Sequence, residues 1–374
     1  MLGSAIALAK RGCEVSVAAI NNNPSITEKV YAEWPMLVGA NVDVEIYNKS
    51  MSFLPGASKN LLESVKERAH CIDVIHVHGV WERIYVDLFK LAQAHKIKFF
   101  ISVHGMLDAW SLKQSPLKKR IALRYFDVGA MLSNADGVMF GTISELREAQ
   151  SVVPMNALVL ANGVSLDDSM LSKLDFSADL LNLFERTQNW RRTFLFFGRV
   201  NPKKGLDTLV EAFLHLPPKY HDVGLLIVGL ADDDNYERRI RERIQNNTLS
   251  NNILWVDGLS GRNAKSALLF SDVFVLPSHQ EGFSMAILEA MTASLPLLIT
   301  SQCHMPEVES NWRNGFVVED TVKAVMEGLV RMAELDDDDL RQMGTRGRQT
   351  VLSFFEWSKV SEALICYYSG CAAA

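Results

Sequence analysis

The sequence predicts an α/β protein built from two doubly wound domains that face a common cleft. Short apolar runs alternate with amphipathic helical segments along almost all of the 374 residues. This alternation is typical of parallel sheets covered by helices on both faces. The chain is also too long for one ordinary core, and a break near its middle divides the pattern into two series of similar length.

The first series belongs to an N-terminal domain, expected over residues 1–165. Its predicted strands are Val15–Ala19, Val42–Tyr47, Val74–Val77, Phe99–Val103, Val138–Phe140 and Leu158–Leu160. Its predicted helices include Leu2–Arg11, Lys59–His70, Arg83–His95 and Leu117–Leu132. Short apolar runs separated by helical periods favour a parallel sheet.

The second series belongs to a C-terminal domain, expected over residues 190–352. Its predicted strands are Phe194–Phe197, Gly224–Val228, Ile253–Val256, Val273–Leu276 and Leu297–Thr300. Its predicted helices are Leu206–Leu216, Glu237–Asn246, Asn263–Ser271 and Phe283–Thr292. The turn signal Asn162-Gly163 opens a stretch without clear strand character that ends near Arg192, so we place the linker there.

A last helix is predicted within residues 353–370, after three closely spaced aromatic residues. Its amphipathic pattern consists of Val360, Leu364, Ile365 and Tyr368. Such a helix must cover apolar surface, either on its own domain or on the first one. Before it, the acidic run Asp336–Asp339 is interpreted as a solvated loop.

Composition and charge narrow the class of protein. The net charge of −6 argues against free nucleic acid as a general partner. No apolar run reaches the roughly 18 residues of a spanning helix, and charged residues interrupt the first apolar stretch, so no signal peptide is predicted. The five cysteines are scattered and form no CxxC pair, which favours a reducing, cytoplasmic setting without structural zinc.

The segment 277–300 carries the strongest functional signal. A loop between two predicted strands turns into a helix and holds Glu281, with Glu289 about two turns into that helix. Gly282 permits a sharp turn, and the amides of Phe283, Ser284, Met285 and Ala286 would point out of the helix start, where an anion is stabilised. Amides for phosphate and carboxylates for hydroxyl groups suit a nucleotide sugar.

A second motif, Gly198 to Gly205, follows the first strand of the C-terminal domain. It carries two cations, Arg199 and Lys204, that can hold a diphosphate without a metal. Taken alone, the motif is better explained as a solvated basic loop, but together with the segment 277–300 it favours a phosphate site. Ligands of open parallel sheets bind beyond the carboxyl ends of the strands, so we expect the site in the cleft between the domains.

Histidines follow two predicted strands of the first domain. His104-Gly105 comes after one of them, and we predict that His104 contacts the ligand. For His76 and His78, after the neighbouring strand, a structural role is the favoured interpretation. For Glu145, at the start of a helix capped by Thr142 or Ser144, capping is the favoured interpretation.

The stretch from Lys113 to Arg124 holds five cations and no acid. Ile121, Leu123 and Tyr125 interleave with them. A solvated helix face is the favoured interpretation, and the alternative is a surface for an anionic acceptor or for the inner face of a membrane.

These residues together resemble glycosyltransferase family 4, the large retaining family with the GT-B fold of two Rossmann-like domains. Glu281 and Glu289 resemble its paired glutamates, Gly198, Arg199 and Lys204-Gly205 its donor-phosphate motif, and His104-Gly105 its first-domain histidine motif. Asn162-Gly163-Val164 and Asn314-Gly315-Phe316 resemble its domain-junction and late-turn motifs. The resemblance spans nearly the whole chain and favours a last helix that packs on the first domain.

The resemblance implies transfer of a sugar from a UDP- or GDP-type donor to a hydroxyl of a glycan or lipid-linked acceptor, with retention and without a metal or other cofactor. Arg199 and Lys204 would hold the diphosphate, Glu289 the ribose and Glu281 the transferred sugar. His104 would act at the reaction centre. The expected setting is polysaccharide, lipopolysaccharide or glycolipid synthesis, in the cytoplasm or at the cytoplasmic face of a membrane.

The chain departs from the family pattern at its start. Members usually open with a strand and a glycine-rich loop before the helix that begins here near Gly3. We therefore expect a first domain without its first strand, shortened by a truncated gene, a start-site error or the choice of the expressed segment. Such a short form would have low stability and weak or no transfer, because the absence of a central strand leaves backbone groups of the neighbouring strands unpaired. Smaller departures are Ser165 and Ser284, where Asp and Gly are common.

Two other functions stay open at this point. A non-catalytic remnant would bind sugar nucleotides without releasing nucleoside diphosphate. A sugar-nucleotide epimerase of the same fold would convert its substrate without any acceptor. The pairing of Arg199 and Lys204 with Glu281 and Glu289 favours the transferase over the epimerase.

Overall fold

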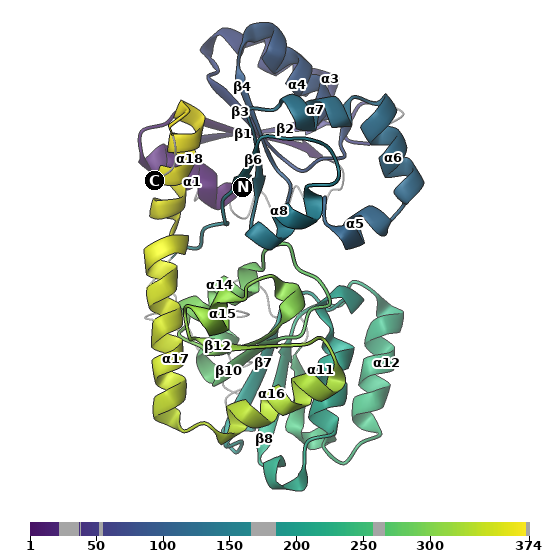
Figure 1. The fold of residues 1–374 in the computed structure, drawn as a ribbon, viewed down its shortest axis with the longest axis vertical. Helices are drawn as coiled ribbons and strands as arrows, with labels where there is room; N and C mark the ends of the chain where they lie inside the picture. Colours follow the sequence, from purple (N-terminus) through teal and green to yellow (C-terminus); the bar gives the residue numbers. More distant parts are fainter. Residues whose placement is uncertain (22–36, 38, 52–54, 166–184, 257–265, 372–374) are drawn as a thin grey trace. The chain divides into compact units, whose positions relative to one another are not determined.

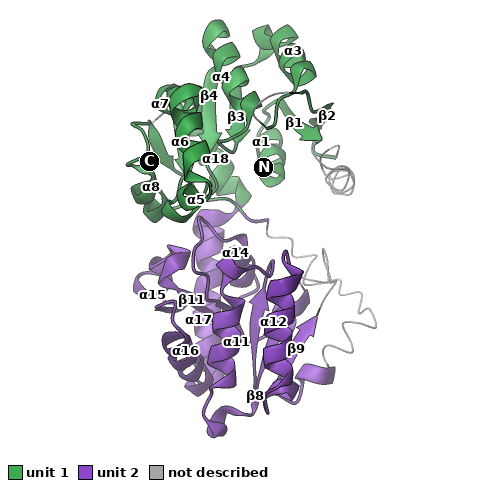
Figure 2. Ribbon diagram, turned by 90° about the vertical axis from the view of Figure 1, so that its right-hand side faces the viewer, with its two compact units in different colours: residues 1–163, 357–374 green, residues 164–356 purple. Residues whose placement is uncertain are grey.

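The computed structural model describes residues 1–21, 37, 39–51, 55–165, 185–256 and 266–371. The chain forms two compact units, one of residues 1–163 and 357–374 and one of residues 164–356 (Figure 2). Both are α/β with parallel strands, as the sequence predicts. Most of the predicted linker lies outside the described residues.

Every apolar run predicted as a strand in the first unit forms one, within two residues at each end. The strands are β1 (Val15–Asn21), β2 (Val42–Asn48), β3 (Val74–His78), β4 (Lys98–Ser102), β5 (Gly137–Phe140) and β6 (Ala157–Val159). They form two parallel sheets instead of one, in the orders β1-β2 and β3-β4-β5-β6. Within the described residues, no strand pairing joins these two sheets.

Three of the four helices with predicted bounds in the first unit form within three residues of those bounds, and the helix Ala109–Lys113 was not predicted. Seven α-helices with described bounds precede residue 163. They are α1 (Leu2–Lys10), α3 (Lys59–Glu67), α4 (Arg83–His95), α5 (Ala109–Lys113), α6 (Pro116–Tyr125), α7 (Val128–Asn134) and α8 (Ile143–Ala149). The single helix predicted over Leu117–Leu132 is wrong, because the chain breaks at Asp127, whose φ of 61° is left-handed. Aspartate tolerates this conformation, and its carboxylate accepts a hydrogen bond from Lys90 at 2.6 Å.

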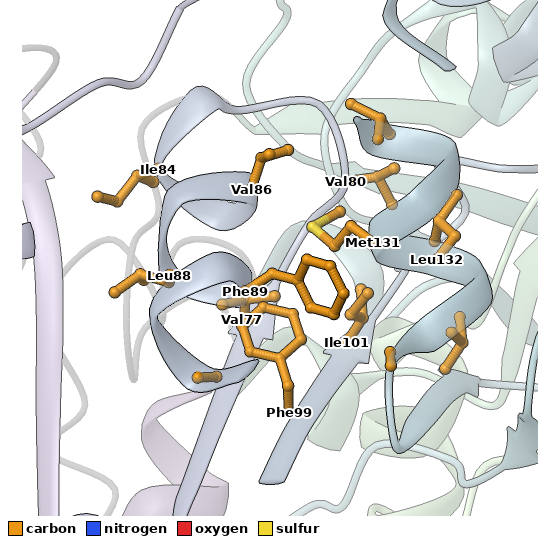
Figure 3. Packing of buried hydrophobic residues seen from close by; sticks show 14 of the residues in the cluster. Val77, Val80, Ile84, Val86, Leu88, Phe89, Phe99, Ile101, Met131 and Leu132 are labelled. Carbon is orange, nitrogen blue, oxygen red and sulfur yellow. The ribbon is translucent and has the colours of Figure 1, made fainter. Parts of the chain in front are cut away.

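The core of this unit lies between the sheet and the helices α4 and α7. Figure 3 shows Phe89 of α4 close to Phe99 and Ile101 of β4. Met131 and Leu132 come from α7, the helix opposite α4 in this view. These side chains are almost fully buried. Each contributes roughly 1.5–3 kcal/mol by leaving water, which fixes the position of the strand ends that carry the histidines.

The last helix, α18 (Trp357–Ser369), belongs to the first unit and lies beside α1 (Figure 1). Val360 and Leu364 pack against Phe100 and Met139 of the sheet. The Nε of Arg11 donates a hydrogen bond to Ser361 at 2.9 Å. The predicted amphipathic face therefore covers apolar surface of the first unit.

The second unit holds one six-stranded parallel sheet in the order β12-β11-β10-β7-β8-β9. Its strands are β7 (Arg192–Phe197), β8 (Val223–Val228), β9 (Ile253–Val256), β10 (Val273–Leu276), β11 (Leu297–Thr300) and β12 (Gly315–Val318). β12 was not predicted, since four residues at a sheet edge give a weak pattern. The strand order reverses between β7 and β10, and ligands of such sheets bind at the carboxyl ends of strands at this switch point.

Among the described residues of the second unit, six α-helices with known bounds accompany this sheet. They are α11 (Leu206–Leu214), α12 (Asp234–Gln245), α14 (Met285–Thr292), α15 (Glu307–Ser310), α16 (Val322–Glu334) and α17 (Asp337–Thr350). The prediction that Asp336–Asp339 is a loop is wrong: Asp336 caps α17 by accepting a hydrogen bond from the amide of Asp339 at 2.8 Å. Acidic residues in a first turn stabilise a helix.

One predicted helix of this unit is only partly described. Residues 263–265 of the predicted helix Asn263–Ser271 lie outside the described residues, and Ala267–Phe270 forms a 3₁₀ turn. Within the described ranges, no helix has both the length and the apolar character required to cross a membrane.

Candidate functional site

In the second unit, the loops after β7 and β10 come together at the switch point of the sheet. The amide of His279, in the second loop, donates a hydrogen bond to the carbonyl of Lys203, in the first, at 2.9 Å. The two sequence motifs around Gly198 and Glu281 therefore form one site, as expected from neighbouring strands of a parallel sheet.

Gly205 allows the first loop to approach the second this closely. Its φ of 67° is left-handed, and a Cβ at this position would lie 2.0 Å from the carbonyl oxygen of Pro277. No other residue type avoids both the strain and the collision. Gly198 also has a positive φ, of 145°, but a Cβ there would meet no atom within 4 Å. Its surroundings are open, which leaves room for a ligand.

The centre of the site is an ion pair between Lys204 and Glu281. The Nζ of Lys204 lies 2.5 Å from the Oε1 of Glu281, and both side chains are largely buried. The hydroxyl of Ser278 donates a second hydrogen bond to the same oxygen at 2.8 Å. A charge removed from water is tolerated only when it is paired and hydrogen-bonded, and this carboxylate is both.

Arg199 does not join this pair. Its guanidinium is three-quarters exposed and lies 3.3 Å from the Oδ2 of Asp232, which also accepts from the side-chain amide of Asn201 at 3.1 Å. The predicted pair of cations is therefore divided between two carboxylates. The partner Asp232 and the hydroxyl of Ser278 were both missed, although Asp232 opens an acidic run just after β8.

The start of α14 presents polar atoms that lack partners. Ser284 is the N-cap residue and is 2% exposed, yet its hydroxyl has no hydrogen-bond partner among the described residues. The same holds for the side-chain oxygen of Gln280, in the preceding loop. Buried polar atoms normally find partners, so these groups at a helix N-terminus are available to hydrogen-bond a polar ligand.

The remaining predicted residues of this segment lie at different depths. The helix begins at Met285 rather than Phe283, so Glu289 is its fifth residue, just over one turn inside, and is half-buried. Met285 is exposed. The ring of Phe283 packs 5.9 Å from that of Phe355, so it contacts the aromatic cluster of its own unit.

In the first unit, three histidines stack on one another: two from β3 and one from the turn after β4. The rings of His76 and His78 lie 4.6 Å apart, and those of His78 and His104 lie 5.2 Å apart. The Nδ1 of His78 is 2.9 Å from the Nε2 of His104, which is hydrogen-bond distance for one donor and one acceptor. The structure thus joins the histidine expected to act with the two expected to be structural.

The inner end of this stack is anchored by hydroxyl groups. His76 contacts the hydroxyl of Tyr368 through Nδ1 at 2.6 Å and that of Ser102 through Nε2 at 2.9 Å. Desolvation is the main cause that lowers the pKa of His76 to about 3, and the neighbouring charge of His104 adds to it. Desolvation also lowers the pKa of His78. At neutral pH the stack is uncharged.

Across the described ranges, no three His, Cys, Asp or Glu side chains are grouped so that they could hold a metal ion. The histidine stack does not form such a group, because its rings face one another instead of converging on a point.

Two family profiles match the chain. Residues 4–168 match Glycosyltransferase Family 4, and residues 184–350 match Glycosyl transferases group 1. The matched ranges contain the histidine stack and the Lys204–Glu281 site, respectively.

Individual proteins of the same kind are similar to this chain. The putative colanic acid biosynthesis glycosyltransferase WcaL of Salmonella typhimurium is 28% identical over 174 residues, which are 45% of this chain and 42% of that protein. The GDP-mannose:cellobiosyl-diphosphopolyprenol alpha-mannosyltransferase of Xanthomonas oryzae is 26% identical over 80% of this chain and 74% of its own.

A solved structure is also similar to this chain in its fold. The crystal structure of Anabaena Alr3699/HepE with UDP superposes with a TM-score of 0.73 at 16% identity, over 96% of this chain and 100% of that one. This likeness shows two Rossmann-like domains of the GT-B type. The two profile matches, which together span residues 4–168 and 184–350, show that the chain belongs to glycosyltransferase family 4, with a group 1 glycosyltransferase domain in its second half.

Proposed function

We propose that this protein transfers a sugar from a UDP- or GDP-type sugar nucleotide to a hydroxyl of a glycan or lipid-linked acceptor, with retention of the anomeric configuration. The observation that carries the proposal is the Lys204–Glu281 pair at the switch point of the second sheet. In this proposal the cation of the pair serves the phosphate and the neighbouring carboxylate serves the sugar hydroxyls. The Xanthomonas relative is a GDP-mannose enzyme and HepE binds UDP, so both bases remain candidates.

In this proposal each predicted residue has a role. Lys204 and Arg199 hold the diphosphate, and the open space at Gly198 and the start of α14 at Ser284 receive its oxygens. Glu289 binds the ribose, Glu281 binds the transferred sugar, and Phe283 and Met285 border the donor. His104 acts at the reaction centre. The two cations neutralise the departing diphosphate, so no metal is required.

Release of nucleoside diphosphate tests this proposal. The purified chain is incubated with UDP- and GDP-sugars in EDTA, with and without glycan and lipid-linked acceptors. Lys204→Ala should lower the rate at least about tenfold. Lys203→Ala removes the neighbouring charge of the same loop and should keep most of the activity. Equal rates in the two variants would refute the site, and a product of inverted configuration by NMR would refute retention.

We propose further that the chain acts at the cytoplasmic face of a membrane and contacts it through α5 and α6. Leu117, Ile121 and Tyr125 are four residues apart, so they share one face of α6, and all three are exposed. Trp110 of α5 is exposed as well. Exposed cations accompany them at Lys113, Lys118, Arg120 and Arg124. The fifth cation, Lys119, instead donates to Ser111.

This surface differs from an ordinary solvated helix because its charges have one sign. No acid lies between Asp108 and Asp127, although the whole chain has a net charge of −6. Cations next to exposed apolar side chains suit anionic phospholipid, which attracts each Lys or Arg by about 1 kcal/mol. The five free cysteines are in keeping with a reducing compartment.

Co-sedimentation with phospholipid vesicles tests the contact. The chain should bind vesicles that contain phosphatidylglycerol more tightly than vesicles of phosphatidylcholine, and salt should weaken the binding. Lys118→Glu with Arg120→Glu, or Leu117→Ser with Ile121→Ser, should reduce binding at least about tenfold. Arg238→Glu with Arg239→Glu, on the basic helix α12, is the control and should have little effect. Equal loss in the control would contradict the proposal.

A further inference from the structure

The turn that carries His104 has an unusual backbone. The amide of Met106 donates to the carbonyl of Val103 at 3.0 Å, and the two central residues, His104 and Gly105, have φ values of 48° and 74°. Positive φ at both central positions is the pattern of a type I′ turn. Glycine adopts it readily, but histidine does so only when the surroundings hold it there.

The side chain of Glu145 holds this turn. Its Oε1 accepts a hydrogen bond from the amide of Gly105 at 2.5 Å, and its Oε2 accepts one from the amide of Gly141 at 2.7 Å. The residue is 1% exposed. One buried carboxylate therefore links the turn after β4 to the end of β5.

Simple helix capping does not explain these contacts. Thr142 and Glu145 have the spacing of a capping box, and the Thr142 half is present, since its hydroxyl accepts from the amide of Glu145 at 3.0 Å. In a capping box the glutamate would accept from the amide of the capping residue, Thr142. Both oxygens of Glu145 bind other amides instead, one of them forty residues earlier in the chain.

Burial of this carboxylate is unfavourable in itself. Desolvation raises the pKa of Glu145, and the amides of Gly141 and Gly105 act against that shift. An apolar side chain would fill the same space without this cost. The two amides are thus the reason a carboxylate is tolerated here.

We propose that Glu145 is a positioning residue that fixes the His104–Gly105 turn and thereby directs the His104 ring onto His78. The ring nitrogens of the two histidines are 2.9 Å apart, a contact that a change in the turn would break. The effect of Glu145 on turnover rests on the proposed transferase function, whereas its effect on the geometry of His104 does not.

Hydrogen exchange and NMR test the geometry without any substrate. In the unmutated protein the amide of Gly105 should be protected from exchange although it lies in a turn. Glu145→Gln keeps one acceptor and places an NH₂ group against the other amide. It should speed exchange of Gly105 at least about tenfold and shift the ring signals of His104, assigned with His104→Asn.

Glu148→Gln is the matched control. Glu148 lies on the same helix and accepts from the amide of Ala109 at 3.1 Å, outside the turn. This variant should leave the His104 signals unchanged. Fast exchange of Gly105 in the unmutated protein, or identical His104 signals in Glu145→Gln, would overturn the inference.

Kinetics separate positioning from a general loss of structure. Glu145→Gln should lower kcat about ten- to a hundredfold with little change in the donor KM, because small displacements of a reacting group have effects of this size. In the double variant with His104→Asn there should be no further loss. If the losses in kcat of the two single variants multiply in the double variant, the inference is overturned. If the unmutated protein releases no nucleoside diphosphate, the proposed function fails while the NMR result still decides the role of Glu145.

Discussion

The ammonium group of Lys204 lies 2.5 Å from the carboxylate of Glu281, so a cation and an anion assigned to different parts of the donor neutralise each other. They come from loops that are 77 residues apart. A buried pair contributes little net stability, but removal of one partner leaves the other charge uncompensated.

Lys204→Met should therefore lower the free energy of unfolding by about 3 kcal/mol. The double variant with Glu281→Leu should recover most of this loss, because both charges are then gone. Urea unfolding followed by circular dichroism measures the effect, with Lys203→Met as the control. If the double variant is less stable than Lys204→Met, the uncompensated charge of Glu281 is not the reason for the loss.

The same pair shows what sequence can and cannot predict. Buried parallel strands are continuous apolar runs, so β7 and β10 were located almost to the residue. Their adjacency is a property of the strand order, and the Lys204–Glu281 contact depends on it. The partner of Arg199, Asp232, comes from the loop after β8 for the same reason. Contacts made across strands have no local pattern.

Local exceptions also escaped prediction. The break between α6 and α7 depends on one left-handed residue, Asp127, inside an otherwise helical pattern. Glu145 has the spacing of a cap, and only the fold reveals that its carboxylate binds Gly105. By contrast, His104 and Glu281 lie in the loops two and five residues after the ends of β4 and β10, where polar residues interrupt apolar runs, and this made them visible as candidate site residues.

Two glycines of the same loop should respond differently to substitution. Gly205→Ala introduces a Cβ 2.0 Å from the carbonyl oxygen of Pro277 at a left-handed φ, so it should destabilise the unit by roughly 3 kcal/mol or more. Gly198→Ala meets no protein atom and should cost only the strain of its φ, about 1 kcal/mol.

Gly198→Ala, which should affect stability less than Gly205→Ala, should affect ligand binding. Calorimetry should show that Gly198→Ala weakens binding of UDP or GDP, since its Cβ occupies the open space assigned to phosphate. Unchanged affinity with lost stability in Gly198→Ala would place the ligand elsewhere.

Arg199 should affect binding but not stability. Its ion pair with Asp232 is exposed, and exposed pairs contribute about 0–1 kcal/mol. Arg199→Ala should therefore leave thermal unfolding nearly unchanged while it weakens nucleoside diphosphate binding about tenfold.

Asp232→Asn provides the opposite test. It releases Arg199 from its carboxylate, so affinity for the nucleoside diphosphate should stay equal or rise. Equal weakening in both variants would show that the ion pair, not the free guanidinium, supports the site.

Acid should destabilise the first unit through His76. The folded protein keeps this ring neutral, because desolvation lowers its pKa from 6.5 to about 3. Below pH 6.5 the unfolded chain binds a proton that the folded chain does not, so stability is fully present above pH 6.5 and falls as the pH decreases toward 3. At pH 5 the loss from His76 reaches at most about 2 kcal/mol.

His76→Gln should remove this part of the pH dependence. Glutamine retains hydrogen-bonding groups for Tyr368 and Ser102 but does not titrate. The difference in urea midpoint between pH 8 and pH 5 should shrink in this variant. His95→Gln is the control, since His95 is an exposed residue in the last turn of α4. An equal reduction in both variants would show that the dependence comes from histidines in general and not from the stack.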